Sequence, residues 1–149
     1  MAEKRRTEFR RMQPEDLEQV AVIEQQCFSE PWSREGFASS LRSPDTLYLT
    51  ALEDGQVVGY CGLLRSFEEA DITNVAVQED HRNQGIAEGM LVELMRQGRE
   101  WGIERFTLEV RISNQAAIHV YEKLGFTSVG VRRGFYSKPK EDAVIMWLL

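Results

Sequence analysis

A glutamate in a strand-like segment is the first residue of this sequence that could carry acid–base chemistry. The segment 106–111 alternates apolar and polar side chains. This pattern puts Leu108 and Val110 on one face of a strand and Glu109 on the other. If helices cover both faces of the sheet, Glu109 lies near the interior, where a carboxylate is suited to accepting a proton near neutral pH. The alternative is a glutamate at a strand end that lies in water or pairs with Arg111.

A tyrosine further along the chain could supply the complementary proton. The helix predicted for residues 114–123 begins at Ser113 or Asn114, both of which are good N-cap residues. At helical spacing, Asn114 and Tyr121 fall on one stripe together with three apolar residues. Tyr121 is therefore either a core residue whose hydroxyl reaches a polar rim, or a proton donor to a leaving group.

A turn between a strand and a helix offers a place for a phosphate. The apolar segment 72–77 is followed by a polar turn, then by Arg82, Asn83, Gln84, Gly85, Ile86 and Ala87, and then by a helix-forming run. Such a turn presents backbone N–H groups at a helix N-terminus, where they bind phosphate or pyrophosphate. The turn lacks the three glycines of a dinucleotide fingerprint and the Gly-Lys-Ser/Thr end of a P-loop. The sequence therefore predicts a nucleotide-bearing cofactor but does not say what that cofactor carries.

Short strands and helices alternate through the first half of the chain. A strand at 8–12 precedes a helix that opens with proline and two acids, and a second short helix is capped by Ser33. The apolar face expected for the first helix is Leu17, Val20, Ala21 and Phe28. Strands at 47–52 and 57–64 form a hairpin, and a strand at 71–77 extends it.

The second half alternates helices with strands. The helix that begins near Gly85 covers one face of the sheet with Ile86, Met90, Leu94 and Trp101, at three- and four-residue spacing. A strand at 106–111, a helix at 114–123 and strands at 129–131 and 144–148 complete the chain. Strands that first form hairpins and then alternate with helices predict a mixed α/β sheet with helices on both faces.

The bulk composition favours one domain and argues against nucleic acid as the main ligand. With 149 residues, of which 42% are hydrophobic and 28% charged, the chain buries a sizeable core without a second domain. We therefore expect a single domain over residues 1–149. A net charge of −6 and a pI near 5.0 disfavour binding to phosphate backbones. The basic run Lys4, Arg5 and Arg6 is expected to be a solvated tail.

The cysteines and histidines do not form a recognisable site. Cys27 and Cys61 lie in apolar surroundings without close spacing, which predicts neither a disulfide framework nor a zinc site. His81 and His119 have no ligand or nucleophile partner in the sequence, so we expect both to be structural or solvent-facing and we expect no metal. No stretch approaches the ~18 apolar residues that span a bilayer, and a cytoplasmic protein is expected.

Taken together, these motifs resemble the GNAT acetyltransferase family, and within it the RimI-like ribosomal-protein alanine N-acetyltransferases. The resemblance covers nearly the whole chain. It rests on Asn74, Val75, Ala76, Val77, Arg82, Gly85, Ala87, Leu108, Glu109, Val110, Arg111, Ser113, Asn114, Ala117, Tyr121, Glu122, Lys123, Leu124, Gly125 and Phe126. It implies a central, mostly antiparallel sheet of about seven strands, splayed in the middle to hold the cofactor.

The resemblance implies acetyl-coenzyme A (acetyl-CoA) as the acetyl donor. Its pyrophosphate would lie on backbone amides of residues 82–87, in agreement with the physical argument for that turn. In the family, the pantetheine arm lies between the strand that ends at Val77 and the strand that carries Glu109. Main-chain groups of Val75, Ala76 and Val77 would bond this arm and polarise the thioester carbonyl.

The resemblance also implies the acid–base roles. Glu109 would be the general base, acting through a water, and Tyr121 would protonate the departing thiolate. Asn114 would contact the cofactor or fix the geometry around Tyr121. A base of modest strength suffices for an N-terminal amine, whose pKa is about 7.7 to 8.0 against about 10.4 for lysine.

Two loops would bound the groove for the acceptor. The segment 28–33 resembles the loop between the family's first two helices and contains Trp32. The segment 132–136 resembles the loop between its last two strands and contains Tyr136. The resemblance makes both aromatic residues candidate substrate contacts. A structural alternative stays open for each, as a core anchor for Trp32 and as an ordinary surface aromatic for Tyr136.

Three positions depart from the family pattern: Ala87 where glycine is commoner, Glu88 where a basic residue is frequent, and Phe135 where tyrosine is usual. Alanine still permits the close approach of a phosphate. An acid at position 88 weakens the attraction for a pyrophosphate unless its side chain points to solvent. Phenylalanine at 135 removes one hydroxyl from the groove, which bears on the choice of substrate.

The implied activity is acetylation of a protein N-terminal amine, the family's usual substrate being the N-terminal alanine of a small-subunit ribosomal protein. Acetylation of lysine or of a small amine by the same machinery is one alternative. A non-catalytic sensor of acetyl-CoA is another. We expect a protein or peptide N-terminus as the partner, no membrane, no direct nucleic-acid partner, and a monomer or weak dimer.

Overall fold

The computed structural model describes residues 7–149, so the basic run at positions 4–6 lies outside the described residues. Its strands are β1 (Thr7–Arg11), β2 (Thr46–Glu53), β3 (Gln56–Ser66), β4 (Glu69–Val77), β5 (Arg105–Arg111), β6 (Thr127–Ser137) and β7 (Lys140–Leu148). Its α-helices are α1 (Leu17–Cys27), α2 (Arg34–Leu41), α3 (Ile86–Glu100) and α4 (Gln115–Lys123). Short 3-10 turns at Pro14–Asp16 and Glu79–His81 precede α1 and α3.

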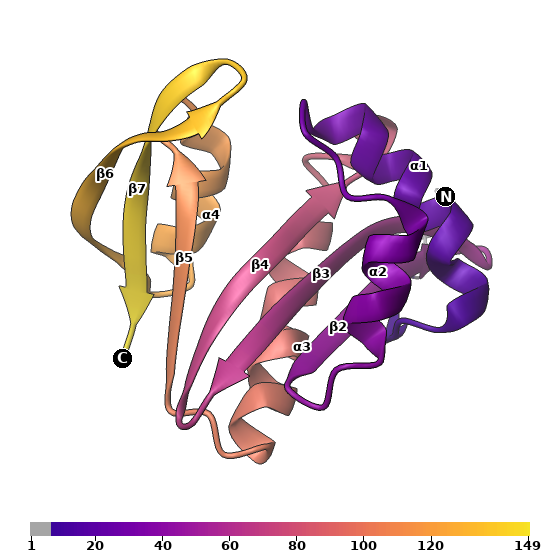
Figure 1. The fold of residues 1–149 in the computed structure, drawn as a ribbon. Helices are drawn as coiled ribbons and strands as arrows, with labels where there is room; N and C mark the ends of the chain where they lie inside the picture. Colours follow the sequence, from indigo (N-terminus) through magenta and orange to yellow (C-terminus); the bar gives the residue numbers. More distant parts are fainter. Residues whose placement is uncertain (1–6) are drawn as a thin grey trace, which may run out of the picture.

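The strands form one seven-stranded sheet in the order β1-β2-β3-β4-β5-β7-β6 (Figure 1). Every neighbouring pair is antiparallel except β4 and β5, which are parallel. This arrangement confirms the mixed, mostly antiparallel sheet expected from the sequence. The central strands β4 and β5 are parallel because α3 carries the chain from the end of β4 back to the start of β5.

The two central strands separate along their length. Parallel pairing between β4 and β5 is limited to Glu69–Asp71 against Arg105–Thr107, and beyond it the strands diverge into a V (Figure 1). On its other side β4 has a register shift against β3, where Gly62 pairs with Asn74 but Leu63 pairs with Ile72. The extra residue, Thr73, bends the strand as a β-bulge does. The bend and the short pairing together open the sheet in its middle.

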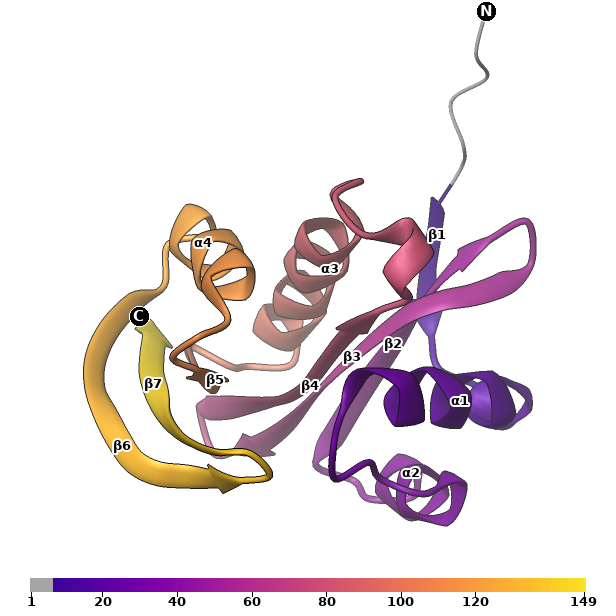
Figure 2. The same cartoon turned by 90° about the horizontal axis from the view of Figure 1, so that it is seen from above.

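Helices cover both faces of the sheet, as predicted. The helices α3 and α4 lie on one face and α1 and α2 on the other (Figure 2). Met90, Leu91 and Leu94 of α3 are fully buried against the first face. Val20 of α1 and Phe37 of α2 are buried in a second apolar cluster on the opposite face.

Two local expectations differ from the structure. The strand predicted at 129–131 extends over Thr127–Ser137, because it is an exposed edge strand whose side chains show little apolar alternation. Phe28 is not on the apolar face of α1, since the helix ends at Cys27 and Phe28 is 41% exposed. The buried stripe of α1 contains Ile23 and Glu24 instead.

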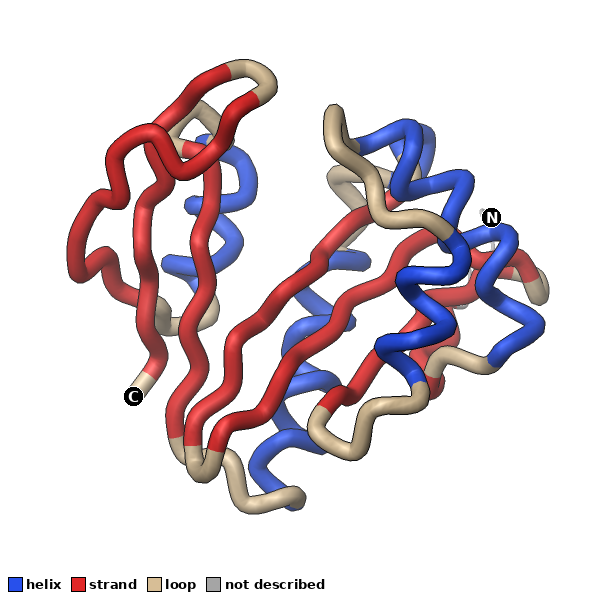
Figure 3. The backbone as a smooth tube through the Cα atoms, in the orientation of Figure 1, coloured by secondary structure: helices blue, strands red, loops and turns tan. Residues whose placement is uncertain are grey.

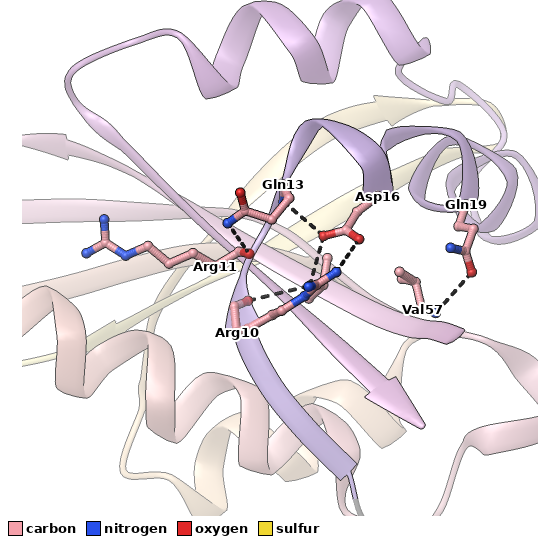
Figure 4. Close-up of polar contacts among 7 residues, drawn as sticks. Arg10, Arg11, Gln13, Asp16, Gln19 and Val57 are labelled. Atoms are coloured by element: carbon pink, nitrogen blue, oxygen red, sulfur yellow. Dashed lines mark hydrogen bonds and ion pairs between the residues drawn. The ribbon is translucent and has the colours of Figure 1, made fainter. Parts of the chain in front are cut away.

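The entry of the chain into α1 is fixed by a buried carboxylate (Figure 4). Asp16 is 2% exposed and accepts hydrogen bonds from Arg10 Nη2 at 2.7 Å and from the backbone N–H of Gln13 at 2.9 Å. Further along the same helix, Gln19 accepts a hydrogen bond from the backbone N–H of Val57 on β3 at 3.0 Å. These contacts attach the first turns of α1 to β1 and β3.

We expect Asp16→Ala to lower the free energy of unfolding by about 2–4 kcal/mol, because it leaves a guanidinium and a backbone N–H without their acceptor. Urea denaturation followed by circular dichroism measures the change. Glu15→Ala is the matched control, since Glu15 is exposed in the same turn, and its effect should stay within about 0.5 kcal/mol. Equal effects of the two substitutions would contradict the role given to Asp16.

Candidate active site

A cleft of about 630 Å³ opens where β4 and β5 diverge. It is lined by Val75 of β4, Glu109 of β5, and Asn114 and Tyr121 at α4. Residues that the sequence analysis selected from three separate segments are thus brought to one cavity. The volume lies within the range of about 300–1,000 Å³ that is usual for small-molecule sites.

Glu109 lies on the open face of β5. Its strand neighbours Leu108 and Val110 are buried on the opposite face, as the alternation predicted. The expectation of an interior position is wrong, because α1 and α2 pack over β2, β3 and β4 and leave this face of β5 to the cleft. The Glu109 carboxylate pairs with Arg132 of β6 at 3.6 Å, whereas Arg111 pairs with Glu141 at 3.1 Å.

Tyr121 of α4 and Asn114 at its N-terminus lie in the same half of the splayed sheet as β5 (Figure 1). Tyr121 is 8% exposed, and burial raises the pKa of its hydroxyl above the usual value of 10. Its ring meets Phe126 edge to face with 6.0 Å between centroids, which holds the ring in place. The side-chain oxygen of Asn114 accepts a hydrogen bond from the backbone N–H of Ala117 at 3.2 Å, so Asn114 is the N-cap of α4, as predicted.

Two loops meet over one end of the cleft. In Figure 3 the loop after α1 and the tip of the β6–β7 hairpin lie at the same end of the V. The Ser29 hydroxyl donates to the Lys138 carbonyl, and the Ser137 hydroxyl donates to a Glu30 carboxylate oxygen at 3.0 Å. Hydrogen bonds therefore join the two halves of the splayed sheet above the cleft.

The two aromatic residues predicted for the groove also line this cleft. Trp32 is 38% exposed and packs against Phe37 with 5.3 Å between ring centroids. Tyr136 is half-buried, and its ring centroid lies 4.2 Å from the guanidinium carbon of Arg111. The same guanidinium donates hydrogen bonds to the carbonyls of Lys138 and Pro139. Burial raises the pKa of Tyr136 and the charge of Arg111 lowers it, with a net increase. Both rings are held by neighbours and leave part of their surface to the cleft.

The sequence analysis missed a buried carboxylate in the cleft wall. Glu24 of α1 is 3% exposed and accepts hydrogen bonds from the Tyr60 hydroxyl and from the backbone N–H of Trp32 at 2.9 Å. Burial and the neighbouring carboxylate raise the pKa of Tyr60, so its hydroxyl keeps the proton that it donates. The available signal was the spacing of Glu24, four residues after Val20 on the apolar stripe of α1.

The turn before α3 lies outside this cleft and has the form expected of a phosphate site. Gly85 is the N-cap of α3 in the left-handed region at φ 77°, and it provides no side-chain cap. A Cβ atom on Gly85 would meet nothing within 4 Å, so the space in front of the helix is open. The first backbone N–H groups of α3 have no partner within the helix. They are therefore free to bind an anion.

The side chains around this turn point elsewhere. Arg82 donates from Nε to the Val77 carbonyl at 3.0 Å and from Nη2 to Cys27 Sγ at 3.4 Å. Ala76, Val77 and Ile86 are buried in the two apolar clusters. Asn83, at φ 63°, and Gln84 are exposed, and Ala87 is half-buried. Binding by residues 82–87 therefore has to come mainly from backbone groups, as the sequence analysis expected.

The family model "Acetyltransferase (GNAT) family" matches residues 17–126, which contain β2 to β5, α3 and α4. The chain belongs to the GNAT acetyltransferase family. The cleft between β4 and β5 is thus the splayed centre of a GNAT sheet, and the family resemblance drawn from the sequence is confirmed. Members of this family use acetyl-CoA as the acetyl donor.

Relatives within the GNAT family are similar over nearly their full length. A Bacillus subtilis protein, named as a candidate ribosomal protein bS18-alanine N-acetyltransferase, is 35% identical over 146 residues, which are 97% of each chain. The Escherichia coli ribosomal protein bS18-alanine N-acetyltransferase is 35% identical over 135 residues, covering 89% of this chain and 90% of that one. A crystal structure of the E. coli ribosomal-protein-S18-alanine N-acetyltransferase superposes with a TM-score of 0.87 at 32% identity, covering 96% and 93%.

The residues present fit acetyl-CoA at two places, the turn before α3 and the wall of the cleft. The open turn at Gly85 offers backbone N–H groups to a pyrophosphate, and Val75 brings the main chain of β4 to the cleft wall. Within residues 7–149 no cluster of three His, Cys, Asp or Glu side chains could hold a metal ion. No helix in that range is long and apolar enough to cross a membrane.

Glu88, an acid where the GNAT family frequently has a basic residue, has a basic partner in this protein. The Glu88 carboxylate pairs with Lys123 Nζ of α4 at 3.2 Å, which links α3 to α4. Both side chains are partly exposed, at 35% for Glu88 and 61% for Lys123, so water screens the pair. The lysine thus offsets part of the negative charge beside the turn.

We expect Lys123→Gln to weaken the binding of acetyl-CoA by about threefold, because it leaves the Glu88 charge unpaired near the α3 N-terminus. Isothermal titration calorimetry with acetyl-CoA measures the dissociation constant. The double variant Glu88→Gln/Lys123→Gln should recover the wild-type affinity, since neither charge remains. Weak binding that persists in the double variant would contradict this compensation.

Proposed function

We propose that the protein transfers an acetyl group from acetyl-CoA to the N-terminal amine of a protein, with the N-terminal alanine of a small-subunit ribosomal protein as the substrate. One observation carries the proposal: a single cleft is lined by Glu109, Tyr121 and Asn114 and by the β4 main chain at Val75. The names of relatives that are 35% identical over most of the chain support the choice of substrate.

Acetyl-CoA supplies the acetyl group as an activated thioester when it is bound. Backbone N–H groups of residues 82–87 hold the pyrophosphate, and main-chain groups of Val75, Ala76 and Val77 orient the arm and polarise the carbonyl. Asn114, by capping α4, fixes the start of the helix that carries Tyr121. These residues position the donor before any proton moves.

Two side chains move the protons of the transfer. Glu109 accepts, through a water, the proton that the acceptor amine loses when the nitrogen–carbon bond forms. Tyr121 donates its hydroxyl proton to the sulfur when the carbon–sulfur bond breaks. The cleft position of Glu109 and the protonated state of Tyr121 that burial favours both support this assignment. The two residues together also argue against a sensor that binds acetyl-CoA without catalysis.

An α-amine suits this site better than a lysine. At neutral pH a larger fraction of an α-amine is uncharged, because its pKa is about 7.7 to 8.0 against about 10.4 for lysine. The loops that meet over the cleft place Trp32 and Tyr136 in its lining, as contacts for the acceptor. Acetylation of lysine or of a small amine remains the alternative within the same family.

Peptides that differ only at their N-terminus test the proposal. We expect acetylation of a peptide with a free N-terminal alanine, and a loss of at least about 100-fold in kcat/KM when that amine is blocked and an internal lysine remains. Thiol release and mass spectrometry of the product measure the transfer and locate the acetyl group. Activity that survives blocking would favour the lysine alternative, and acetyl-CoA binding without any transfer would favour a sensor.

A further inference from the structure

We propose that a second pocket beside the cleft is a subsite for one uncharged side chain of the acceptor peptide, close to its N-terminus. The pocket lies between α2 and the strands β2, β3 and β4, and its volume is about 250 Å³. This is below the usual range of about 300–1,000 Å³ for a whole ligand, so it suits a single side chain. The inference rests on the proposed peptide substrate.

The subsite lies next to the cleft, since Trp32 and Thr73 line both cavities. Thr73 lies two residues before Val75, or roughly 6–7 Å along a strand. An extended peptide advances about 3.3–3.6 Å per residue, so a chain whose amine is beside Val75 brings its second or third residue to Thr73.

The lining of the subsite is hydroxyl-rich and uncharged. It consists of Trp32, Ser39, Ser40, Ser43, Thr46, Tyr48, Leu64 and Thr73. Because none of these residues is ionisable near neutral pH, a charged side chain of a substrate would find no counterion among them. An uncharged side chain is therefore preferred.

Three of the six hydroxyl groups in the lining present lone pairs to an occupant, because their hydrogens are already donated within the protein. Thr46 donates to the Ser40 carbonyl at 2.5 Å, Thr73 to the Gly62 carbonyl at 3.5 Å, and Tyr48 to the Asn74 side-chain oxygen at 3.4 Å. A hydroxyl that has donated its hydrogen can still accept. These three hydroxyls favour an occupant that carries a neutral donor, such as the amide of glutamine or the hydroxyl of tyrosine, over a carboxylate, which can only accept.

The walls of the subsite are held in place. The backbone of Trp32 is fixed by its hydrogen bond to buried Glu24, and its ring packs on Phe37. The N-terminus of α2 is capped by the Ser33 hydroxyl, which accepts from the backbone N–H of Gly36 at 3.1 Å. Tyr48 is 4% exposed. A cavity with rigid walls can discriminate between side chains without prior rearrangement.

Acceptor peptides with a free N-terminal alanine test the inference. They carry glutamine, lysine or glutamate at the second or third residue and are otherwise identical. We expect kcat/KM of the wild-type protein to fall about tenfold from glutamine to glutamate at one of these positions, with lysine between them. The variant Ser39→Asp places a carboxylate at the exposed rim of the pocket and should raise the lysine-to-glutamine ratio about threefold.

Ser128→Asp is the matched control, because Ser128 is exposed on β6, outside both linings, and the substitution adds the same charge. The lysine-to-glutamine ratio of kcat/KM for this variant should equal that of the wild type. The subsite is overturned if kcat/KM does not depend on the side chain at the second or third peptide residue. It is also overturned if Ser39→Asp and Ser128→Asp have equal lysine-to-glutamine ratios. In both cases the proposed function stands. Absence of turnover with every free alanine peptide overturns the proposed function, and the subsite with it.

Discussion

The variant Glu109→Gln is expected to lower kcat by about 100-fold or more while the dissociation constant of acetyl-CoA stays within about twofold. Glutamine keeps the size of the side chain but cannot accept a proton. Because Glu109 lies on the open face of β5, the substitution leaves the buried neighbours Leu108 and Val110 in place. Single-turnover acetylation of an alanine peptide measures the chemical step, and calorimetry measures the affinity.

The loss cannot be attributed to the broken ion pair. Arg132 is 55% exposed, so water solvates its guanidinium when Glu109 is neutral, and the unfolding free energy should change by less than about 1 kcal/mol. Glu122→Gln on the exposed side of α4 is the matched control and should keep full activity. A kcat of Glu109→Gln within about threefold of the wild type would refute the role of Glu109 as the general base.

Tyr121→Phe is also expected to lower kcat by about 100-fold, again with little change in the affinity for acetyl-CoA. Phenylalanine keeps the ring that packs on Phe126 and removes only the hydroxyl. Without that proton the sulfur must leave as a thiolate. Stopped-flow detection of the released thiol measures the rate.

The pH dependence of the Tyr121 role follows from the direction of its pKa shift. Burial raises the pKa of Tyr121, so the protonated hydroxyl is favoured and remains available up to a pH of at least about 10. Loss of activity by ionisation of Tyr121 should therefore begin only above that pH in the wild type.

The double variant Glu109→Gln/Tyr121→Phe should lose less activity than the product of the two single losses, because the two groups act in one transition state. A Tyr121→Phe rate close to that of the wild type would contradict the acid role.

Much of the fold could be predicted because it depends on local patterns. Alternation and helical spacing identified nearly every element to within a few residues, and Ser33 and Asn114 are the N-caps that their side chains predicted. The length of the edge strand β6 was underestimated, because side chains that lie mostly in water show no periodic pattern of apolar residues. The elements of the candidate site were found for the same reason, since each lies at a strand or helix position with a clear pattern.

The partners of the site residues could not be predicted. Glu109 pairs with Arg132 and not with its strand neighbour Arg111, and Glu88 pairs with Lys123 from another helix. Glu24 reaches the cleft wall through contacts with Tyr60 and Trp32. Each of these pairs joins residues that are eight or more positions apart, and their proximity depends on how the elements pack.

By itself, the sequence determined the mixed sheet, the order of its helices and strands, the glycine turn before α3, and the set of residues that resemble the GNAT family. Local backbone preferences and side-chain periodicity are sufficient for these features. Only the tertiary structure decided that β4 bends at Thr73 and parts from β5 after three pairs, and that the resulting cleft holds Glu109 and Tyr121 together. The separation of two strands is a balance of long-range contacts across the whole sheet, and no short segment encodes it.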